Sequence, residues 1–473
     1  MDNQELENEI VITDKEVMVE EKKNKEVKKP EKAEKGEKKG RLKRFFSKKR
    51  NVVITILVVL ILATGGVLAF LLLNKNNNNG EGQEQSGGTS VKPNVKKFYD
   101  NLTGELVSYS GIQYNKDGSE KKDEDGKTIF YSDNQAEQYA DANNTKRISC
   151  VQIPNGTDAR PQVGLTDAKI VFEAIAEAGI TRFAAIYRDS KADVIGPVRS
   201  LRMYYLEWDD PFDCTIVHAG GETNALNKVK TYPHLSESKT YMWRDSSAYR
   251  APNNLFTSGE LLGKFNSDNN YDKSRPAVFS RMTPDESDEE IKAIRAQTEK
   301  KEGETENNSE SEANENAKKY TLANKIYVHV TNAANYNVIY NYDSASNTYL
   351  RSYEGNSGKH MVYDCKNLTA SGAKIKPQKD CGAAVQVAPK VVVVMKVKEQ
   401  QNQINHYRED LETTGSGEAY IFQNGIKIEG TWAKDKINSQ IVFKDKNGEV
   451  IKLAPGQTFI TAIAKSYGYV KAE

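Results

Sequence analysis

Residues 147–187 read RISCVQIPNGTDARPQVGLTDAKIVFEAIAEAGITRFAAIY, and their pattern decides the fold expected for the middle of the chain. Residues 147–154 and 180–187 are short runs rich in β-branched and aromatic residues, which is typical of strands. Residues 166–177 begin at a threonine suited to cap a helix and carry apolar residues at helical spacing. The stretch therefore predicts a strand, a helix and a second strand.

The same alternation continues to about residue 280. Residues 197–208 suit a helix with proline in its first turn, and residues 214–218 (CTIVH) read as a short buried strand. Residues 222–230 suit another helix. Because strands that alternate with helices are typical of a largely parallel sheet, we predict an α/β domain over residues 97–282.

The C-terminal part of the chain has a different pattern. Residues 391–397 (VVVVMKV), 419–432 (AYIFQNGIKIEGTW) and 458–464 (TFITAIA) are short β-rich runs. Asn-Gly pairs at 424–425 and 447–448 are hairpin-turn signals. We predict a mainly antiparallel β domain over residues 321–473. Residues 283–320 between the two domains are charged and polar, which predicts a linker whose first part can form one capped helix.

An uncharged stretch near the N-terminus predicts a membrane anchor. Residues 52–73 (VVITILVVLILATGGVLAFLLL) would form a helix of about 33 Å, long enough to cross a bilayer. Residues 21–50 carry 15 basic and five acidic side chains, so the positive-inside rule places the N-terminus in the cytoplasm. A cleaved signal peptide is the alternative, but a leader of 50 residues is too long for one. A soluble core helix would show a polar side.

These features predict a single-pass protein of the cell membrane with its C-terminal domains outside the cell. Residues 1–50 are expected to be a disordered cytoplasmic tail, residues 51–73 the transmembrane helix, and residues 74–96 a flexible tether. The basic cluster beside the membrane would lie against anionic lipid headgroups.

Composition excludes some classes of protein. The 67 basic and 66 acidic side chains give a net charge of +1, so we expect no nucleic-acid partner. Four cysteines in 473 residues exclude a cysteine-dense scaffold. The five histidines show no metal-ligand spacing, so we expect neither a metal nor a cofactor.

Many short motifs in the two domains follow one order. In the first domain they are ARPQ at 159–162, KIVFE at 169–173, GITRF at 179–183, IGPVRSLR at 195–202, HAGG at 218–221, WRD at 243–245 and APNNLFTS at 251–258. In the second they are GSG at 415–417, GTWAK at 430–434 and LAPGQTF at 453–459. Together they resemble the YerB-like bacterial exported proteins, a family of unknown function. The resemblance implies two domains on the outer face of a membrane of the Gram-positive type, and it implies no activity.

The chain departs from that family at three places. Family members are often lipoproteins, whereas residues 52–73 predict a transmembrane anchor here. The family's Glu-Gly-Gly is replaced by Glu177-Ala178-Gly179, and its Pro-His-Asn by Pro252-Asn253-Asn254. The last change weakens any mechanism that needs a histidine at that position.

Polar side chains at the ends of the predicted elements form the candidate ligand site. They are Arg160, Glu173, Arg182, Arg199, Arg202, His218, Arg244, Arg250 and Asn254. Arg199 would lie at the start of the predicted helix at 197–208, where free N–H groups attract anions. The arginine fork suits a carboxylate or a phosphate. We therefore predict a pocket for an anionic envelope ligand. The alternative is that the arginines pair internally with Glu173, Glu177, Asp167 and Asp245.

An enzyme is the second class of function considered. His218 could act as a base, but the chain has no nucleophile-elbow motif, no metalloprotease motif and no phosphate loop. We expect a binding or scaffold module for an anionic cell-wall ligand or an envelope protein partner. An envelope hydrolase that uses His218 is the alternative.

The four cysteines allow three pairings. The domain boundaries favour Cys150–Cys214 within the first domain and Cys365–Cys381 within the second. Buried free cysteines remain an alternative for the first pair, because both of its members lie in predicted strands.

Overall fold

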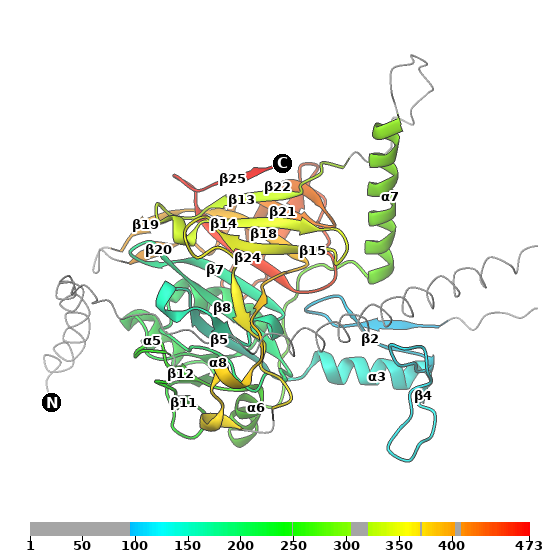
Figure 1. The fold of residues 1–473 in the computed structure, drawn as a ribbon, viewed down its shortest axis with the longest axis horizontal. Coiled ribbons are helices and arrows are strands. Elements are labelled where there is room, and N and C mark those ends of the chain that lie inside the picture. Colours follow the sequence, from blue (N-terminus) through cyan, green and yellow to red (C-terminus); the bar gives the residue numbers. More distant parts are fainter. Residues whose placement is uncertain (1–94, 248, 304–319, 369–370, 403–407) are drawn as a thin grey trace, which may run out of the picture. The chain divides into compact units, whose positions relative to one another are not determined.

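The computed structural model describes residues 95–473 apart from 248, 304–319, 369–370 and 403–407 (Figure 1). Its main feature is a sheet of ten strands in the order β10-β9-β5-β8-β7-β24-β18-β21-β22-β23. The strands of this sheet are β5 (Ile148–Pro154), β7 (Ile170–Glu177), β8 (Ile180–Arg188), β9 (Thr215–Val217), β10 (His234–Leu235), β18 (Val391–Val397), β21 (Gly415–Gln423), β22 (Ile426–Lys434), β23 (Val442–Asp445) and β24 (Thr458–Ala464).

The two segments that the sequence divides at residues 283–320 contribute to the same sheet. β24 pairs in parallel with β7, so that Thr458 lies opposite Ile170 and Thr461 lies opposite Glu173. Figure 1 shows these strands side by side, although they come from distant parts of the colour bar. Residues Lys92–Glu473 form one compact unit. The predicted linker at residues 283–320 separates the two segments in the sequence, but both segments contribute strands to one sheet.

The predicted α/β class with a largely parallel sheet is wrong, because the described chain is mostly β with few helices. β5 and β7 each pair antiparallel with β8. The predicted helix at 166–177 is strand β7, which is buried along nearly its whole length. A strand buried on both faces has almost no polar positions, so its apolar spacing also fits a helix.

The helix expected over residues 197–208 is also shorter than predicted. Only α4 (Met203–Asp209) is helical, and residues 198–201 pair with neighbouring segments instead. Val198 N–H donates to the carbonyl of Leu255, and Leu201 N–H donates to the carbonyl of Gly220. Arg199 therefore lies on extended backbone and not in a helix.

The remaining elements lie at the margins of the sheet or pack on its faces. The other described helices are α3 (Asp133–Asn144), α5 (Thr223–Val229), α6 (Gly259–Asp268), α7 (Pro284–Gly303) and α8 (Pro377–Asp380). The other strands are β1 (Lys97–Tyr99), β2 (Leu106–Tyr109), β3 (Gly111–Ile112), β4 (Phe130–Tyr131), β6 (Gln162–Val163), β11 (Trp243–Arg244), β12 (Leu255–Phe256), β13 (Lys325–His329), β14 (Val338–Asp343), β15 (Thr348–Tyr353), β16 (Met361–Tyr363), β17 (Val385–Gln386), β19 (Glu399–Gln401), β20 (Glu409–Leu411) and β25 (Tyr469–Ala472).

A second sheet, in the order β15-β14-β13-β25, packs one face against the ten-stranded sheet. Its inward side chains Ile326, Val328 and Tyr340 share a buried apolar cluster with Val392 and Phe422 of the large sheet. All neighbouring strands of this second sheet are antiparallel. One face of this second sheet is thus covered by the large sheet, and its opposite face points outward.

None of the helices that the structure describes is long and apolar enough to span a membrane. The residues of the predicted transmembrane helix, 51–73, lie outside the described part of the chain. The predicted cytoplasmic tail at 1–50 lies outside it as well.

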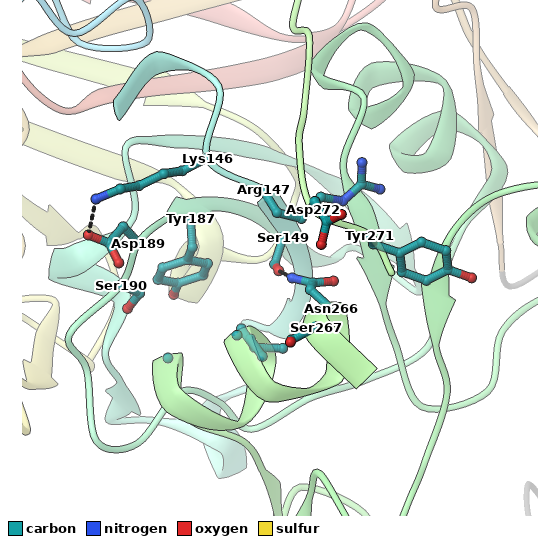
Figure 2. A pocket seen from close by; sticks show the side chains of 13 residues that line it. Lys146, Arg147, Ser149, Tyr187, Asp189, Ser190, Asn266, Ser267, Tyr271 and Asp272 are labelled. Carbon is teal, nitrogen blue, oxygen red and sulfur yellow. Dashed lines mark hydrogen bonds and ion pairs between the residues drawn. The ribbon is translucent and has the colours of Figure 1, made fainter. Parts of the chain in front are cut away.

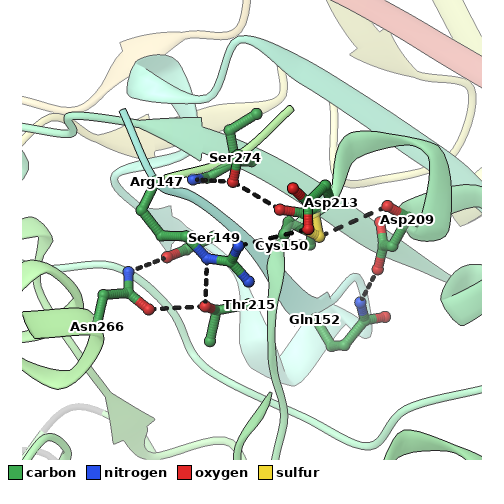
Figure 3. The surroundings of a disulfide bond; sticks show 11 residues. Arg147, Ser149, Cys150, Gln152, Asp209, Asp213, Thr215, Asn266 and Ser274 are labelled. Atoms are coloured by element: carbon green, nitrogen blue, oxygen red, sulfur yellow. Dashed lines mark hydrogen bonds and ion pairs between the residues drawn. A yellow bond between two sulfur atoms is a disulfide. The ribbon is translucent and has the colours of Figure 1, made fainter. Parts of the chain in front are cut away.

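The structure contains two disulfide bonds, Cys150–Cys214 and Cys365–Cys381, which are the two pairs favoured by the domain boundaries. Cys150 lies on β5 and Cys214 immediately before β9, so the first bond joins two adjacent strands (Figure 3). The carboxyl group of Asp209 lies nearby, fully buried, and accepts a hydrogen bond of 2.9 Å from Gln152 Nε2.

Candidate functional site

Strands β5 and β9 run parallel and separate at their carboxyl ends, and Arg199 lies in the resulting fork. Their register ends with Val151 opposite Val217. Beyond this pair, Arg199 N–H donates to the carbonyl of Gln152 at 2.8 Å, and Ala219 N–H donates to the carbonyl of Arg199 at 3.0 Å. In open α/β sheets, ligands bind outside the carboxyl ends of parallel strands, and β5 and β9 form a parallel pair although this sheet is not of that class. The backbone therefore holds Arg199 at a strand-end position suited to binding.

A tight hairpin brings a carboxylate to this fork. β7 and β8 are joined by Ala178 and Gly179, which have φ values of 48° and 76°. Two positive φ values are typical of the hairpin turn that matches strand twist, and alanine is an unusual residue there. Glu177 at the end of β7 accepts a hydrogen bond of 2.6 Å from Arg182 Nη2 on its Oε1, and another from Arg202 Nη2 on its Oε2.

The carboxylate of Glu177 therefore pairs with two buried arginines, Arg182 and Arg202. Only 3% of Arg182 and 4% of Arg202 are exposed. Burial alone would raise the pKa of Glu177, but the charges of Arg182 and Arg202 outweigh burial and lower this pKa to about 2. Glu177 is consequently ionised at neutral pH, and its single negative charge faces two positive charges.

Arg199 is the third cation of this cluster, and its charge is not neutralised by an ion pair. Among the described residues, no side chain forms a hydrogen bond or ion pair with its guanidinium, and its Nε is buried without a partner. Burial, followed by the charge of Arg182, lowers the pKa of Arg199 to about 10, so it stays protonated at neutral pH. We call Arg182, Arg199, Arg202 and Glu177 the arginine site. Among these four groups three cations face one anion, while the negative charges of Asp158 and Glu222 also act on Arg199 and Arg202 from nearby.

The helix N-terminus that was expected to attract the anion is already occupied. Helix α4 begins at Met203, whose N–H donates a hydrogen bond of 2.6 Å to Glu222 Oε1. The prediction that Arg199 starts a helix is wrong, because the helix begins only at Met203. The carboxylate of Glu222 also already accepts a hydrogen bond from the first N–H group of this helix. Of the three arginines, Arg182 and Arg202 are bonded to Glu177, so Arg199 is the side chain that we consider for an anion.

Two other predicted ligand residues, Arg160 and Glu173, belong to a separate buried network. Glu173 Oε2 accepts a bond of 2.7 Å from Arg351 Nη2, and neither side chain is exposed to solvent. Arg351 Nη1 contacts His360 Nδ1, and His360 Nε2 lies 3.0 Å from Gln162 Oε1. We call Glu173, Arg351, His360, Gln162 and Asn155 the buried clasp. It ties residues of the N-terminal segment to residues of the C-terminal segment.

Asn155 lies at the centre of the buried clasp. Its Nδ2 donates to Thr181 Oγ1 at 2.7 Å and to Glu173 Oε1 at 3.1 Å. Its Oδ1 accepts bonds from Arg160 Nε at 3.0 Å and Tyr353 OH at 2.7 Å. The Arg160 guanidinium also lies 3.6 Å from the centre of the Tyr353 ring. Because these groups satisfy one another, the clasp holds the fold together and leaves Arg160 and Glu173 little capacity for a ligand.

Sequence reasoning missed Arg351 and His360 as members of this network. A signal was present in residues 349–353 (YLRSY), where the first, third and fifth residues point inward and are buried. Arg351 occupies the middle inward position, and a fully buried arginine is rare without a partner. The sequence could indicate a buried charge but not the glutamate that pairs with it.

The third group of predicted residues supports a loop. Arg244 donates to Asn254 Oδ1 at 2.7 Å and pairs with Glu237, while Asn254 Nδ2 donates to Ser246 Oγ at 2.8 Å. Arg250 is exposed. Asn253, which replaces the family's histidine, donates to Asp158 Oδ2 at 2.7 Å. Asp158 is one of the charges that act on Arg199, so the loop approaches the arginine site without supplying a cation to it.

His218 is 2% exposed, and its surroundings give no support to catalysis. Its Nδ1 is bonded at 2.9 Å to the carbonyl of Gly220, and its ring stacks on His234 at 6.0 Å. Burial lowers the pKa of His218. Within the described chain no hydroxyl or carboxylate is hydrogen-bonded to either ring nitrogen, so the hydrolase alternative lacks an adjacent nucleophile.

A pocket of about 350 Å³ lies elsewhere, between the start of β5 and helix α6 (Figure 2). In its charged lining Lys146 lies 2.8 Å from Asp189, and Arg147 lies 3.5 Å from Asp213 and donates to Thr215 Oγ1 at 3.1 Å, while Arg147 Nη2 is buried without a partner among the described residues. None of the predicted ligand residues lines it. We favour the arginine site over this pocket because Arg199 has no ion-pair partner among the described residues, whereas Lys146 and Arg147 each have one.

Comparison with known proteins places both segments in one family. The N-terminal domain of "Protein of unknown function (DUF3048)" matches residues 136–272, and its C-terminal domain matches residues 326–460. The putative lipoprotein YerB of Bacillus subtilis is 26% identical over 326 residues, which are 67% of this chain and 81% of YerB. The crystal structure of YerB protein from Bacillus subtilis superposes with a TM-score of 0.53 at 22% identity, covering 79% of this chain and all of that one. This last likeness shows a shared fold alone.

Proposed function

We propose, on the premise that this chain belongs to the YerB-like family defined by the two DUF3048 domains, that it is a cell-envelope protein that binds an anionic ligand at the arginine site. Two observations support the location. The relative in Bacillus subtilis is named a putative lipoprotein, which associates that protein with a membrane. The two disulfide bonds are typical of proteins outside the reducing cytosol.

The observation that carries the proposal is the unpaired charge of Arg199. Two of the three arginines pair with one ionised glutamate, and Arg199 lacks a side-chain partner in the part of the chain that the structure describes. A half-buried cation without a partner is unfavourable, and an anion bound there would relieve the repulsion from Arg182. The planar fork of arginine recognises carboxylate or phosphate through two hydrogen bonds. We therefore assign the ligand to one of these two classes of anion.

The test is a thermal-shift titration of the purified full chain with inorganic phosphate, glycerol phosphate and galacturonate. A ligand at 100 times its dissociation constant adds about 2.7 kcal/mol of stability, which shifts the unfolding temperature by about 3 °C in a protein of this size. We expect Arg199→Gln to abolish the shift. Arg199→Lys should retain part of it, because the charge remains while the fork is lost.

Arg295→Gln is the matched control, since Arg295 is an exposed arginine on α7. Loss of the shift in Arg199→Gln with its retention in the control would support the proposal. A wild-type protein that responds to none of the three anions, or a shift that survives in Arg199→Gln, would overturn it.

A further inference from the structure

The outward face of the second sheet carries an unusual group of aromatic side chains. Strands in such a sheet alternate between an apolar inward face and a polar outward face. Here Ile326 and Val328 of β13 point inward and are fully buried, whereas Tyr327 and His329 point outward. Tyr469 on the neighbouring strand β25 is also outward and 38% exposed. We call Tyr327, His329 and Tyr469 the aromatic face.

The three rings lie close enough to form one continuous surface. His329 is the register partner of Tyr469, and their rings stack with centres 4.7 Å apart at an angle of 13°. The ring of Tyr327 lies 5.8 Å from that of Tyr469. Lys471, the register partner of Tyr327, holds its Nζ 5.2 Å from the centre of the Tyr469 ring. His329 and Tyr469 are therefore stacked on one another, Tyr327 is tilted beside them, and the Lys471 ammonium lies over the Tyr469 ring.

A hollow of about 330 Å³ adjoins the aromatic face at Tyr327. Tyr327 and Ile339 form its apolar wall, and the charged side chains around it are Lys325, Lys471, Glu354 and Glu473. Two cations therefore face two carboxylates. This balance differs from the arginine site, where positive charge is in excess, and it does not favour a strongly anionic ligand.

Glu354 is fixed in an orientation that leaves one of its oxygens available. Its Oε2 accepts hydrogen bonds of 2.9 Å from Tyr327 OH and 2.8 Å from Asn337 Nδ2. Both bonds end on Oε2, so Oε1 keeps its lone pairs for a donor entering the hollow. A ligand that matches this site needs a flat apolar surface for the rings and hydroxyl groups for the carboxylate and the lysines.

We propose that the aromatic face and the adjoining hollow bind an uncharged carbohydrate segment. A sugar ring presents C–H groups on its faces, which suit the Tyr327 ring that lines the hollow, and hydroxyl groups at its rim, which suit Glu354 and Lys471. An extended peptide is the competing occupant, because β25 is an edge strand of this sheet. Such a peptide would pair through its backbone and would not need the three rings. The site shares no residue with the arginine site, so either proposal can fail alone.

The experiment measures binding of triacetylchitotriose and cellotriose to the full chain by saturation-transfer NMR and titration. We expect saturable binding that weakens at least about tenfold in Tyr469→Ala and in Tyr327→Ala, as for other central aromatic contacts. Tyr469→Trp keeps an aromatic surface and should retain binding even if the alanine variants fold poorly. Tyr114→Ala is the matched control, because Tyr114 is 51% exposed and lies far along the chain in another segment. It should bind as the wild type does.

Three results would overturn the proposal. The first is that neither trisaccharide binds the wild-type chain. The second is that binding is equal in Tyr469→Ala and the wild type. The third is that an uncharged alanine–threonine hexapeptide binds saturably and the trisaccharides do not, which would assign the sheet edge to a peptide partner. Unchanged trisaccharide binding in Arg199→Gln would support two separate sites.

Discussion

Breaking the Glu173–Arg351 ion pair should strongly destabilise the whole of the described fold. Neither side chain is exposed, and their atoms lie 2.7 Å apart. Glu173→Gln keeps the shape of the side chain but leaves the guanidinium of Arg351 buried without a counter-charge. Breaking a buried pair in this way costs about 3–5 kcal/mol. Arg351 also contacts His360, and burial together with the Arg351 charge lowers the pKa of His360, so the histidine stays neutral and adds no second positive charge.

The expected loss converts into a measurable change of unfolding temperature. A unit as long as Lys92–Glu473 unfolds with an entropy of roughly 0.8 kcal/mol per kelvin, so a loss of about 4 kcal/mol lowers the midpoint by about 5 °C. Thermal unfolding followed by circular dichroism measures this shift, and urea titration gives the free energy independently. The double variant Glu173→Gln/Arg351→Met should lose less than the sum of the two single variants, because the second change removes the orphaned charge.

The control for this prediction is an exposed ion pair. Lys264→Met breaks the contact with Asp268 on the surface of α6, and we expect it to cost less than about 0.5 kcal/mol. A midpoint for Glu173→Gln within about 1 °C of the wild type would refute the reasoning. So would single-variant losses that simply add in the double variant.

Three further predictions concern the arginine site and the interior. Glu177→Gln should lower the free energy of unfolding by at most about 3 kcal/mol at pH 7, because the folded pKa of Glu177, about 2, lies below its pKa in the unfolded chain. In the wild type this contribution is present above about pH 5 and is lost as the pH falls toward 2. Measuring stability across an acid titration checks this. Asp209→Asn should stabilise the protein at pH 8 and change its stability little at pH 4. Burial raises the pKa of Asp209, so the ionisation of this carboxyl opposes folding as the pH rises. Equal effects of the substitution on the thermal unfolding midpoint at the two pH values would contradict this. Ala178→Gly should raise stability by up to about 1 kcal/mol, because it relieves the positive φ of 48° at an exposed turn; a loss of more than about 1 kcal/mol in urea titration would show that the methyl group contributes packing.

Local signals predicted part of the fold correctly. Residues 147–154 and 180–187 are strands as expected, because their β-branched residues suit a pleated and buried surface. Asn424 and Gly425 have φ values of 52° and 79° and join β21 to β22, which confirms the hairpin predicted from that dipeptide. Such features depend on residues close together in the chain, so their pattern is visible in the sequence.

The sequence predicted only part of the candidate site, because it does not show which distant side chains meet. The group of nine polar residues included Arg182, Arg199 and Arg202, which the structure does bring together around Glu177. It also included Glu173, which belongs to the buried clasp, and Arg160, which donates a hydrogen bond to Asn155 of the clasp. A charged residue near the end of an element looks the same in the sequence whether it faces solvent or a buried partner.

The sequence by itself determined the family, the strand-rich character of residues 391–464 and the turns that join neighbouring strands. Only the tertiary structure decided that β7 and β24 lie side by side, and that Glu173 of β7 meets Arg351 of β15 across 178 positions of the chain. Pairing between distant strands depends on which buried surfaces fit together after the chain has closed long loops, and no local pattern of residues records that choice. The same pairing explains why residues 170–177 form a strand: with strands on both sides and apolar layers on both faces, their continuous apolar pattern is satisfied in the middle of a sheet.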